Sequence, residues 1–372
     1  MNPSSTRIVL VGPLPPPAGG MAGQTEQLAR LLRGEGIDVD VVQVNAPYRP
    51  AWVSGLRGLR AMCRLVPYLA KLWSAIGRAD LVHLMANSGW SWHLFATPAL
   101  WVAWLRRVPS IVNYRGGEAA SFLERHAPVV RASMSRASLL VVPSGFLQEI
   151  FGRHGMVAEI VPNVVDLARF RPVARSDDND RPHLVVTRNL EQIYGNDIAI
   201  RALPLISQAY PEAQLTIAGS GPCLASLQQL ARSLGVAERV HFVGRLDRDG
   251  VAELYRDAHL MLNPSRVDNM PNAVLEALAC GIPVVSSRVG GLPFMVEDGV
   301  DARLVAPDDP AAFASAALAL LSDRETRTRM IRRGLENAHR HSWSAVKDQL
   351  FSAYRRALDG ARQPGQECKR VP

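Results

Sequence analysis

Cysteine is scarce in this sequence, and the few cysteines are not arranged as a site. No CxxC pair occurs, and the four are Cys63, Cys223, Cys280 and Cys368. Zinc sites and disulfide frameworks both need cysteines at paired spacings. We therefore expect reduced thiols in a cytosolic protein, with no metal site and no disulfide framework.

Long apolar runs are lacking as well. The N-terminal run is only IVLVG, which is too short for the core of a signal peptide. The stretch Leu81–Leu105 contains no Asp, Glu, Lys or Arg and has the length of a membrane span, which needs roughly 20 apolar residues. Polar residues interrupt its front half. It therefore favours a strand, a loop and a helix beginning at Thr97 over a span, which is the alternative.

Acidic residues are few in the first half of the chain. Residues 1–165 hold 16 Lys and Arg against 9 Asp and Glu, so they carry +7 of the formal net charge of +8. Between Asp40 and Glu118 the only acidic residue is Asp80. This asymmetry indicates an anionic partner for the first half.

The sequence does contain a regular alternation of short β-branched runs and helical segments. RIVLVG, LVHLM and SIVNY fall in the first half, and the rhythm restarts after the polar stretch SDDND with HLVVT, QLTIAGSG and VHFVG. Strands that alternate with helices predict an α/β fold with doubly wound parallel sheets, and the restart predicts two of them. One large sheet is the alternative. We expect a hinge near Val161–Pro172.

Two segments that follow predicted strands carry residues suited to phosphate. Gly19 and Gly20 precede a helix expected to begin near Gln24, and paired glycines let the backbone approach a phosphate at a helix N-terminus. The segment is neither GxGxxG nor a P-loop, and a plain turn is the alternative. Arg188 follows HLVVT, where it could hold a diphosphate; a surface salt bridge is the alternative. Gly219 ends IAGSGP, and Gly244 with Arg245 ends VHFVGR, in turns that admit a close ligand.

The segment DNMPNAVLEALACG predicts a buried helix, with Pro271 in its first turn and Cys280-Gly281 at its end, that carries one unusual carboxylate and follows another. The helix is apolar on every side, so Glu276 must be paired or contact a ligand. A ribose diol offers it two hydrogen-bond donors. Asp268 precedes the helix, where it and the exposed amides could bind sugar hydroxyls. The alternative is that Asp268 caps the helix and Glu276 pairs with an internal arginine.

Together these segments resemble the retaining nucleotide-sugar glycosyltransferases of the GT-B architecture, specifically glycosyltransferase family four of the bacterial group 1 type. PSRVDNMPNAVLEALACGIPVVSSRVGGLP is similar to the acid-x7-acid signature of that family. GGMAG, IAGSGP, VHFVGR and the terminal HSWSAVKDQLFSAYRRAL are similar to further family segments. The resemblance implies two Rossmann-like domains that face a central cleft: an acceptor-binding domain 1–165, a donor-binding domain 166–342, a terminal helix 343–361 that returns to the first domain, and a tail 362–372.

The resemblance also implies roles for single residues. Glu276 would bind the ribose, and Arg188 would neutralise the diphosphate. Asp268, with the amides that follow it, would hold the donor sugar and the leaving group, and Gly20 would face the β-phosphate or the sugar. The donor-binding set is then Gly19, Gly20, Arg188, Gly219, Gly244, Arg245, Asn269, Met270, Pro271, Asn272 and Glu276. No metal ion or cofactor is required; the donor is a UDP- or GDP-sugar.

Three departures from the family pattern qualify this picture. The first acidic position is usually Glu and is Asp268 here. The family usually has Lys-Gly after the arginine, whereas Tyr194-Gly195 stand here. The strand SIVNY leads to Arg115 without the histidine that is common in the family, and Arg115 would then supply the catalytic charge that the lysine does not. A non-catalytic nucleotide-sugar-binding protein and a GT-B epimerase or phosphorylase therefore remain as alternatives.

The remaining expectations concern the acceptor. We expect a glycan or lipid-linked acceptor, no nucleic acid, and a cytoplasmic protein attached peripherally to an anionic membrane surface at the inner face of the plasma membrane. The stretch Val53–Arg78 motivates the membrane, because apolar and basic stripes run side by side along one helix, with Pro67 kinking or dividing it. The apolar stripe is Leu56, Leu59, Cys63, Val66, Ala70, Trp73 and Ile76; the basic one is Arg57, Arg64, Lys71 and Arg78. A helix whose apolar stripe faces the domain core is the alternative.

Overall fold

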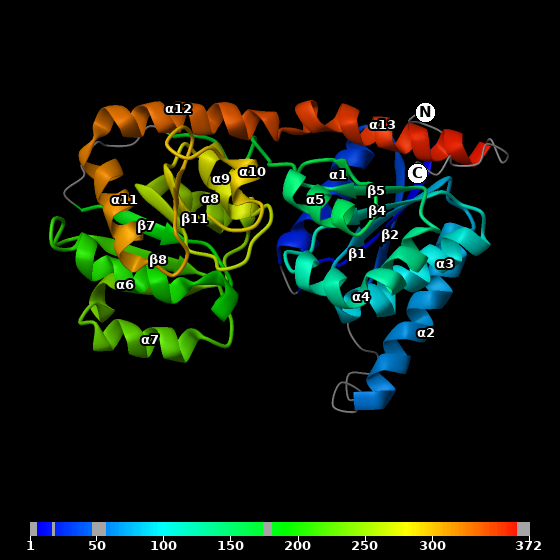
Figure 1. Cartoon of the computed structure of the whole chain (residues 1–372), viewed down its shortest axis with the longest axis horizontal. Helices are drawn as coiled ribbons and strands as arrows, with labels where there is room; N and C mark the ends of the chain where they lie inside the picture. The colour runs from blue at the N-terminus through cyan, green and yellow to red at the C-terminus, as the bar shows by residue number, and fades with distance from the viewer. Residues whose placement is uncertain (1–5, 17–18, 47–56, 174–180, 363–372) are drawn as a thin grey trace. The chain divides into compact units, whose positions relative to one another are not determined.

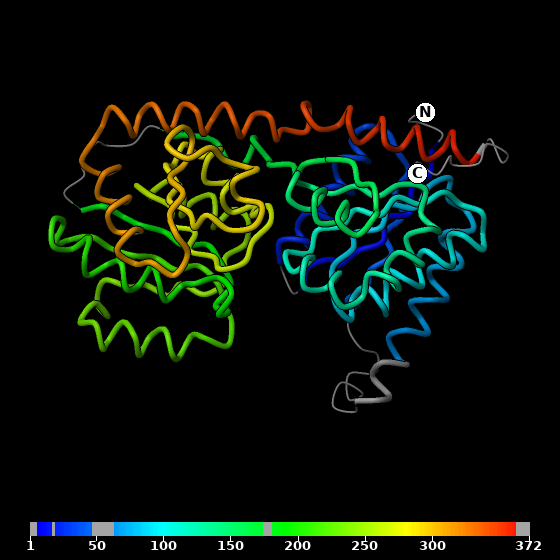
Figure 2. The backbone as a smooth tube through the Cα atoms, in the orientation of Figure 1, coloured from blue at the N-terminus to red at the C-terminus, as the bar shows by residue number. Residues whose placement is uncertain are grey.

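The structure is a computed structural model of the whole chain (Figure 1). It describes residues 6–16, 19–46, 57–173 and 181–362. The chain divides into two compact units. The first unit contains residues 1–162 and 346–372, and the second unit contains Asn163–Ala345. The chain thus leaves the first unit after Pro162 and returns to it at Val346, in the orange-to-red part of the tube in Figure 2.

The described part of the first unit is built on a six-stranded parallel sheet in the order β2-β1-β3-β4-β5-β6. Its strands are β1 (Arg7–Gly12), β2 (Asp38–Gln43), β3 (Leu81–Ala86), β4 (Ser110–Tyr114), β5 (Leu139–Val142) and β6 (Glu159–Ile160). Its helices are α1 (Gly20–Gly34), α2 (Arg57–Ile76), the π-helix η3 (Trp92–Ala96), α3 (Thr97–Leu105), α4 (Ala119–Met134), α5 (Gly145–Arg153) and α13 (Trp343–Arg362), which starts in the second unit.

The second unit repeats this plan with the parallel strand order β12-β11-β10-β7-β8-β9. Its strands are β7 (His183–Val186), β8 (Gln214–Ala218), β9 (Val240–Gly244), β10 (Leu260–Asn263), β11 (Val284–Ser287) and β12 (Arg303–Val305). Its helices are η4 (Gln192–Tyr194), α6 (Asn196–Ile206), α7 (Leu224–Ser233), η5 (Ala237–Arg239), α8 (Arg248–Asp257), α9 (Asn272–Ala279), α10 (Leu292–Met295), α11 (Pro310–Ser322) and α12 (Arg324–Arg340).

Helices cover both faces of the second sheet, which explains why its strands are apolar throughout (Figure 1). In β7, Leu184 and Val186 join a cluster that includes α6, α7 and α11. Val185, between them, points to the opposite face and packs in a separate cluster that includes α8 and α9. The prediction of two doubly wound parallel sheets is therefore confirmed, and the alternative of a single continuous sheet is wrong.

The strand orders also define where each sheet changes direction. In the second unit, β8 and β9 lie on one side of β7, whereas β10, β11 and β12 lie on the other. In the first unit, β2 lies on one side of β1 and β3 on the other. Connections diverge at these two points, so the carboxyl ends of β7 with β10, and of β1 with β3, flank an opening where open α/β sheets bind ligands.

Several local expectations need correction. Helix α1 begins at Gly20 with Gly19 as its N-cap, four residues before the expected start at Gln24, because glycine is well tolerated at these terminal positions. Helix α2 continues through Pro67 and is not divided there. Between Leu81 and Leu105 the strand and the helix form as predicted, but the π-helix η3 occupies part of the predicted loop and leads directly into α3 at Thr97. Among the described residues, no helix has the length and apolarity to cross a bilayer.

Candidate functional site

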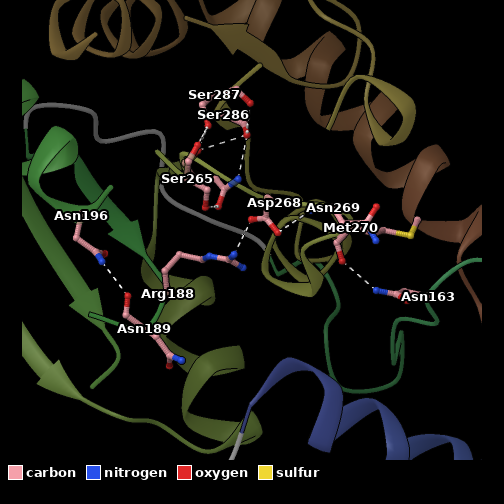
Figure 3. Close-up of polar contacts among 11 residues, drawn as sticks. Asn163, Arg188, Asn189, Asn196, Ser265, Asp268, Asn269, Met270, Ser286 and Ser287 are labelled. Atoms are coloured by element: carbon pink, nitrogen blue, oxygen red, sulfur yellow. Dashed lines mark hydrogen bonds and ion pairs between the residues drawn. The ribbon is translucent and has the colours of Figure 1, made fainter. Parts of the chain in front are cut away.

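The carboxyl ends of β7 and β10 bring Arg188 and Asp268 together. An Nη2 atom of Arg188 donates to Oδ2 of Asp268 at 2.5 Å, and both side chains are largely buried, at 12% and 11% exposed (Figure 3). The second carboxylate oxygen accepts the backbone N–H of Asn269 at 3.1 Å. The sequence predicted both residues for the site but not the contact between them. The ion pair fixes the arginine at the point where the sheet changes direction.

Tyr194 lies against the other side of this arginine. Its ring centroid is 4.3 Å from Cζ of Arg188, in a cation–π contact. Tyr194 stands where the family usually has a lysine. An aromatic ring that packs against Arg188 therefore takes the place of a second positive charge. Nε of Arg188 is buried and has no hydrogen-bond partner within the part of the chain that the structure describes. The guanidinium thus has a donor that its partners in the described chain do not use.

The backbone of the arginine is held by the glycine turn after β8. A Cβ atom added to Gly219 would lie 2.0 Å from the carbonyl oxygen of Arg188, and one added to Gly221 would lie 2.4 Å from that of Leu190. Leu190 also donates its N–H to the carbonyl of Ser220 at 3.1 Å. Glycine at 219 is therefore needed for two chain segments to touch. The sequence had assigned this turn to close approach by a ligand.

The segment before α9 is equally constrained. The side-chain amide of Asn163 donates to the carbonyl of Met270 and to Oδ1 of Asn272, both at 2.9 Å (Figure 3). A Cβ atom added to Gly291 would lie 2.1 Å from the carbonyl oxygen of Asn269. Pro271 is the N-cap of α9 and not, as the sequence suggested, a residue of its first turn. Asp268 does not cap this helix, because its hydrogen bond goes to Asn269.

Buried hydroxyl groups form hydrogen bonds with the part of the chain that leads from β10 to Asp268. The side chain of Asn263, at the end of β10, donates to Oγ of Ser286 at 3.0 Å and accepts from Oγ of Ser265 at 3.2 Å. Ser287 donates to the carbonyl of Ser265 (Figure 3). All four side chains are buried. This network fixes the exit of β10 and hence the direction in which Asp268 leaves the sheet.

Glu276 lies inside α9, one turn after the start of the helix, and is half-buried. Burial raises the pKa of its carboxyl to about 7, although Arg248, Arg169 and Arg188 act to lower it. Within the described residues, no hydrogen bond or ion pair of its carboxylate is found. The alternative in which Glu276 pairs with an internal arginine is therefore not what the structure shows. A half-buried carboxylate with no hydrogen-bond donor in the described chain suits a ligand that carries hydroxyl groups.

Gly244 and Arg245 lie farther along the same edge of the second sheet. Gly244 ends β9 with a φ of +70°, a conformation that favours glycine, and its carbonyl accepts the N–H of Gly219 at 2.8 Å. Arg245 is exposed. The structure thus joins Gly244 to the turn that holds Arg188, whereas Arg245 makes no contact that connects it to the pair of Arg188 and Asp268.

The first unit holds the remaining predicted residues. Gly19 has an extended backbone, and a Cβ atom added to it would meet no atom within 4 Å, so space remains beside the N-terminus of α1. Gly20 is the first residue of that helix. Both follow β1, which flanks the point where the first sheet changes direction. No carboxylate stands in the first turn of α1, so its N-terminal amides meet no acidic side chain there.

Arg115 follows β4 and belongs to a buried polar chain. Its Nε donates to Oδ1 of Asn113 at 3.1 Å, and its Nη1 donates to Oε1 of Gln24 at 3.3 Å. The amide of Asn113 contacts Nε2 of His83 at 3.2 Å, and Nδ1 of His83 lies 2.8 Å from the hydroxyl of Tyr354. Burial lowers the pKa of Arg115 to about 10 and that of His83 to about 3. These contacts tie Arg115 to α1.

Some residues of the site gave no signal in the sequence. Tyr255 is fully buried; its hydroxyl contacts Oγ1 of Thr187 at 2.5 Å and donates to the carbonyl of Ala273 at 3.0 Å. It thereby joins the end of β7 to the first turn of α9. Asn163 and Gly291 likewise hold the segment before α9. Asn163 does so through its side-chain hydrogen bonds, and Gly291 through its close approach to the backbone of Asn269. The sequence could have flagged Gly291, since it belongs to a glycine pair after a predicted strand.

Comparison with known proteins accounts for this arrangement. A family model described as "Glycosyltransferase Family 4" matches residues 18–169, and one described as "Glycosyl transferases group 1" matches residues 181–323. The glycogen synthase of Mycobacterium tuberculosis is 31% identical over 306 residues, which cover 77% of this chain and 71% of that protein. A D-inositol 3-phosphate glycosyltransferase of Segniliparus rotundus is 32% identical over 230 residues, 59% of this chain. The match spans about half of that relative, 51% of its length.

Solved structures show the same fold. Sucrose-phosphate synthase from Thermosynechococcus elongatus superposes with a TM-score of 0.74 at 22% identity, over 95% of this chain and 100% of that chain. Anabaena HepE in complex with UDP-glucose gives 0.71 at 19% identity, over 94% and 99%. The two Rossmann-like units therefore form a GT-B fold. The chain belongs to glycosyltransferase family 4, and it is a glycosyltransferase of the group 1 type.

Proposed function

We propose that this glycosyltransferase moves a sugar, with retention of configuration and without a metal ion, from a UDP- or GDP-sugar to a glycan or lipid-linked acceptor in bacterial surface polysaccharide or glycolipid biosynthesis. The observation that carries the donor assignment is the arginine at the switch point of the second sheet. Arg188 is clamped by Asp268 and Tyr194 but retains an unused donor. HepE, whose fold is similar, was crystallised with UDP-glucose, which supports a nucleotide-sugar donor.

In the proposed reaction, the bond from the anomeric carbon to the diphosphate breaks and a bond to an acceptor hydroxyl forms. Negative charge grows on the departing diphosphate as the bond breaks. Arg188 would stabilise that charge, in a position fixed before the reaction starts, and such preorganised stabilisation is usually the largest catalytic term. The backbone N–H groups of Met270 and Asn272 would contribute further donors, with Asp268 orienting the arginine.

The remaining donor contacts follow the same chemistry. We assign the ribose diol to Glu276, because a carboxylate can accept hydrogen bonds from both hydroxyl groups of the diol. The glycines before α1, Gly19 and Gly20, are assigned to the close approach of a phosphate or sugar to the N-terminus of that helix. Gly244 and Arg245 are assigned to the far end of the donor site beside Gly219. Arg115 would act indirectly, by positioning α1.

A screen of nucleotide sugars tests this function. The protein is incubated with UDP- and GDP-sugars in the presence of EDTA, with and without a bacterial lipid extract, and free and transferred sugars are measured. We expect transfer that persists in EDTA and depends on the extract. Binding without turnover would instead make the chain a non-catalytic nucleotide-sugar-binding protein. Release or isomerisation of the sugar alone would make it a phosphorylase or an epimerase.

The raised pKa of Glu276 predicts a pH dependence of donor binding. The carboxyl is protonated below about pH 7 and ionised above it. Only the ionised form accepts from both ribose hydroxyls, so donor affinity should rise as the pH rises from about 6 to 8, with a slope of at most about tenfold per unit. Titration calorimetry with the donor found in the screen measures this, since its diphosphate diester stays ionised over that range.

Glu276→Gln provides the control for this prediction. The amide has nearly the same shape but does not titrate, so its donor affinity should be weaker and flat with pH. A wild-type affinity that does not change between pH 6 and 8, or an equal slope in the variant, would assign the ribose to another residue.

The membrane part of the proposal rests on the charge of the first half of the chain. We propose a cytoplasmic protein held peripherally at the inner face of the plasma membrane, where lipid-linked acceptors would be reached. Helix α2 was expected to supply the apolar stripe for this contact. The side chains of residues 47–62 lie outside the described part, but Val66, Ala70 and Trp73 of that stripe are exposed. The buried face of α2 is formed by Tyr68, Leu72, Ala75 and Ile76, so Ile76 of the predicted stripe faces the core instead.

A further inference from the structure

One surface of the first unit exposes large aromatic side chains beside arginines. It is formed by α2, by α3 and by the turn after α4. Trp73, Trp104 and Leu105 are 49%, 50% and 58% exposed, and Trp101 is 39% exposed. We call this surface the tryptophan patch; its members are Trp73, Trp101, Trp104, Leu105, Arg106 and Arg136.

Direct contacts order the members of the patch in two groups. The rings of Trp101 and Trp104 meet edge to face with centroids 5.6 Å apart. The guanidinium of Arg136 lies 4.1 Å from the first centroid and 5.1 Å from the second. Between α3 and α2, the guanidinium of Arg106 lies 4.8 Å from the ring centroid of Trp73. Cation–π contacts therefore hold both the rings and the charges at the surface.

The sequence of α3 explains why part of it remains uncovered. Its nine residues, TPALWVAWL, carry no charge. Ala99, Leu100 and Ala103 fill the core of the unit, so the opposite face of the same helix must present the tryptophans. A helix that is apolar all round is normally surrounded by apolar material. An exposed aromatic patch of this kind marks a contact surface.

The charge around the patch indicates what it contacts. Helices α2 and α3 contain no acidic residue, and Lys71, Arg78 and Arg107 are exposed on or beside them. Tryptophan suits the border between headgroups and acyl chains, because its ring is apolar and its N–H is polar. Arginine and lysine beside it attract anionic headgroups. A protein partner would need a matching acidic surface, whereas an anionic bilayer supplies both an apolar layer and negative charge.

We infer that the tryptophan patch inserts into the headgroup region of an anionic phospholipid bilayer and is the membrane-docking surface of the protein. This inference sharpens the membrane part of the proposed function. It moves the contact from the apolar stripe of α2 to a surface shared by α2 and α3. Vesicle binding is measured without a donor or an acceptor, so its failure and the failure of sugar transfer can be told apart.

The test is co-sedimentation of the full chain with vesicles of phosphatidylcholine, with or without phosphatidylglycerol, at low and high salt. We expect binding to anionic vesicles only, weakened by salt. Trp101→Ser with Trp104→Ser should weaken it about tenfold or more. Arg106→Gln with Arg107→Gln should weaken it roughly fivefold per charge. Trp90→Ser and Arg153→Gln are the matched controls, since both residues are exposed in the same unit but outside the patch.

A second measurement needs no variant. Brominated acyl chains in the anionic vesicles should quench the tryptophan fluorescence of the wild type, and the loss of Trp101 and Trp104 should remove most of that quenching. Equal binding to neutral and anionic vesicles, binding to neither, or quenching equal in the patch variant and in Trp90→Ser would overturn the inference. Self-association that the patch variant abolishes, without vesicle binding, would assign the surface to a second copy of the chain instead.

Discussion

Replacement of Arg188 with alanine is expected to lower the rate of sugar transfer about ten- to a hundredfold. The substitution removes charged hydrogen bonds worth on the order of 1.5–3 kcal/mol, and about 1.4 kcal/mol corresponds to a factor of ten. The loss should appear in kcat more than in the Kd of the donor, because charge on the leaving diphosphate is greatest in the transition state. Steady-state kinetics and donor calorimetry separate the two quantities.

The same substitution also leaves Asp268 without its partner in a largely buried place, at 11% exposed. Loss of stability could therefore imitate loss of catalysis. Arg188→Lys keeps the charge but not the planar fork or the stacking on Tyr194, so it should fold and still be impaired. Arg201→Ala, an exposed residue of α6, is the control for lost positive charge. Wild-type turnover in Arg188→Ala would disprove the phosphate role.

The variant Asp268→Asn tests the role of the Asp268 carboxylate. The amide keeps the size of the side chain but is neutral, and its single oxygen can replace only one of the two carboxylate oxygens that now accept from Arg188 and Asn269. Loss of transfer with an unchanged melting temperature would support a role toward the donor or in orienting Arg188. A lower melting temperature with unchanged transfer per folded molecule would mean that the pair only stabilises the fold.

Gly219→Ala is expected to have the second large effect. A Cβ atom at this position would lie 2.0 Å from the carbonyl oxygen of Arg188, so the two segments must separate. We expect a loss of roughly 1–3 kcal/mol in the free energy of unfolding, as in overpacked cores, together with weaker donor binding as Arg188 shifts. Urea unfolding followed by circular dichroism and donor calorimetry measure the two consequences.

Gly152→Ala is the matched control for this substitution. Gly152 is a helical residue of α5, and a Cβ atom added there would meet no atom within 4 Å. Alanine should stabilise that helix by roughly 0.5–1 kcal/mol. A Gly219→Ala variant as stable as the wild type, with unchanged donor affinity, would show that the close packing at this turn is not needed.

The sequence predicted the architecture well because its signals are local and repeated. Most strands of the two sheets are short apolar runs rich in β-branched residues, and a helix follows almost every one, so the alternation alone gives two doubly wound sheets. Helix α9 was recognised because Pro271 and Gly281 mark its ends. The short strands β6 and β12, of two and three residues, were missed, since so few residues show no periodicity.

For the candidate site, the sequence singled out individual residues but not the contacts between them. The end of the strand HLVVT identified Arg188, and the start of the helix that follows Pro271 identified Asp268, yet no rule of sequence states that two side chains 80 positions apart form a pair. Tyr194 appeared as a missing lysine, whereas its ring in fact supports the arginine. Arg115 was expected to provide charge for the reaction, and its contacts with Asn113 and Gln24 lie within the first unit. Such pairings are tertiary and depend on strand order.

The return of α13 to the first unit has a consequence for biosynthesis. Tyr354 of this helix is fully buried and contacts His83, so the first unit lacks part of its interior until residues 346–362 have left the ribosome. The second unit is contiguous from Asn163 to Ala345 and needs no later segment to close its sheet. The unit that is translated first must therefore be completed last, and its unfinished apolar surface is available to chaperones during the synthesis of the entire second unit.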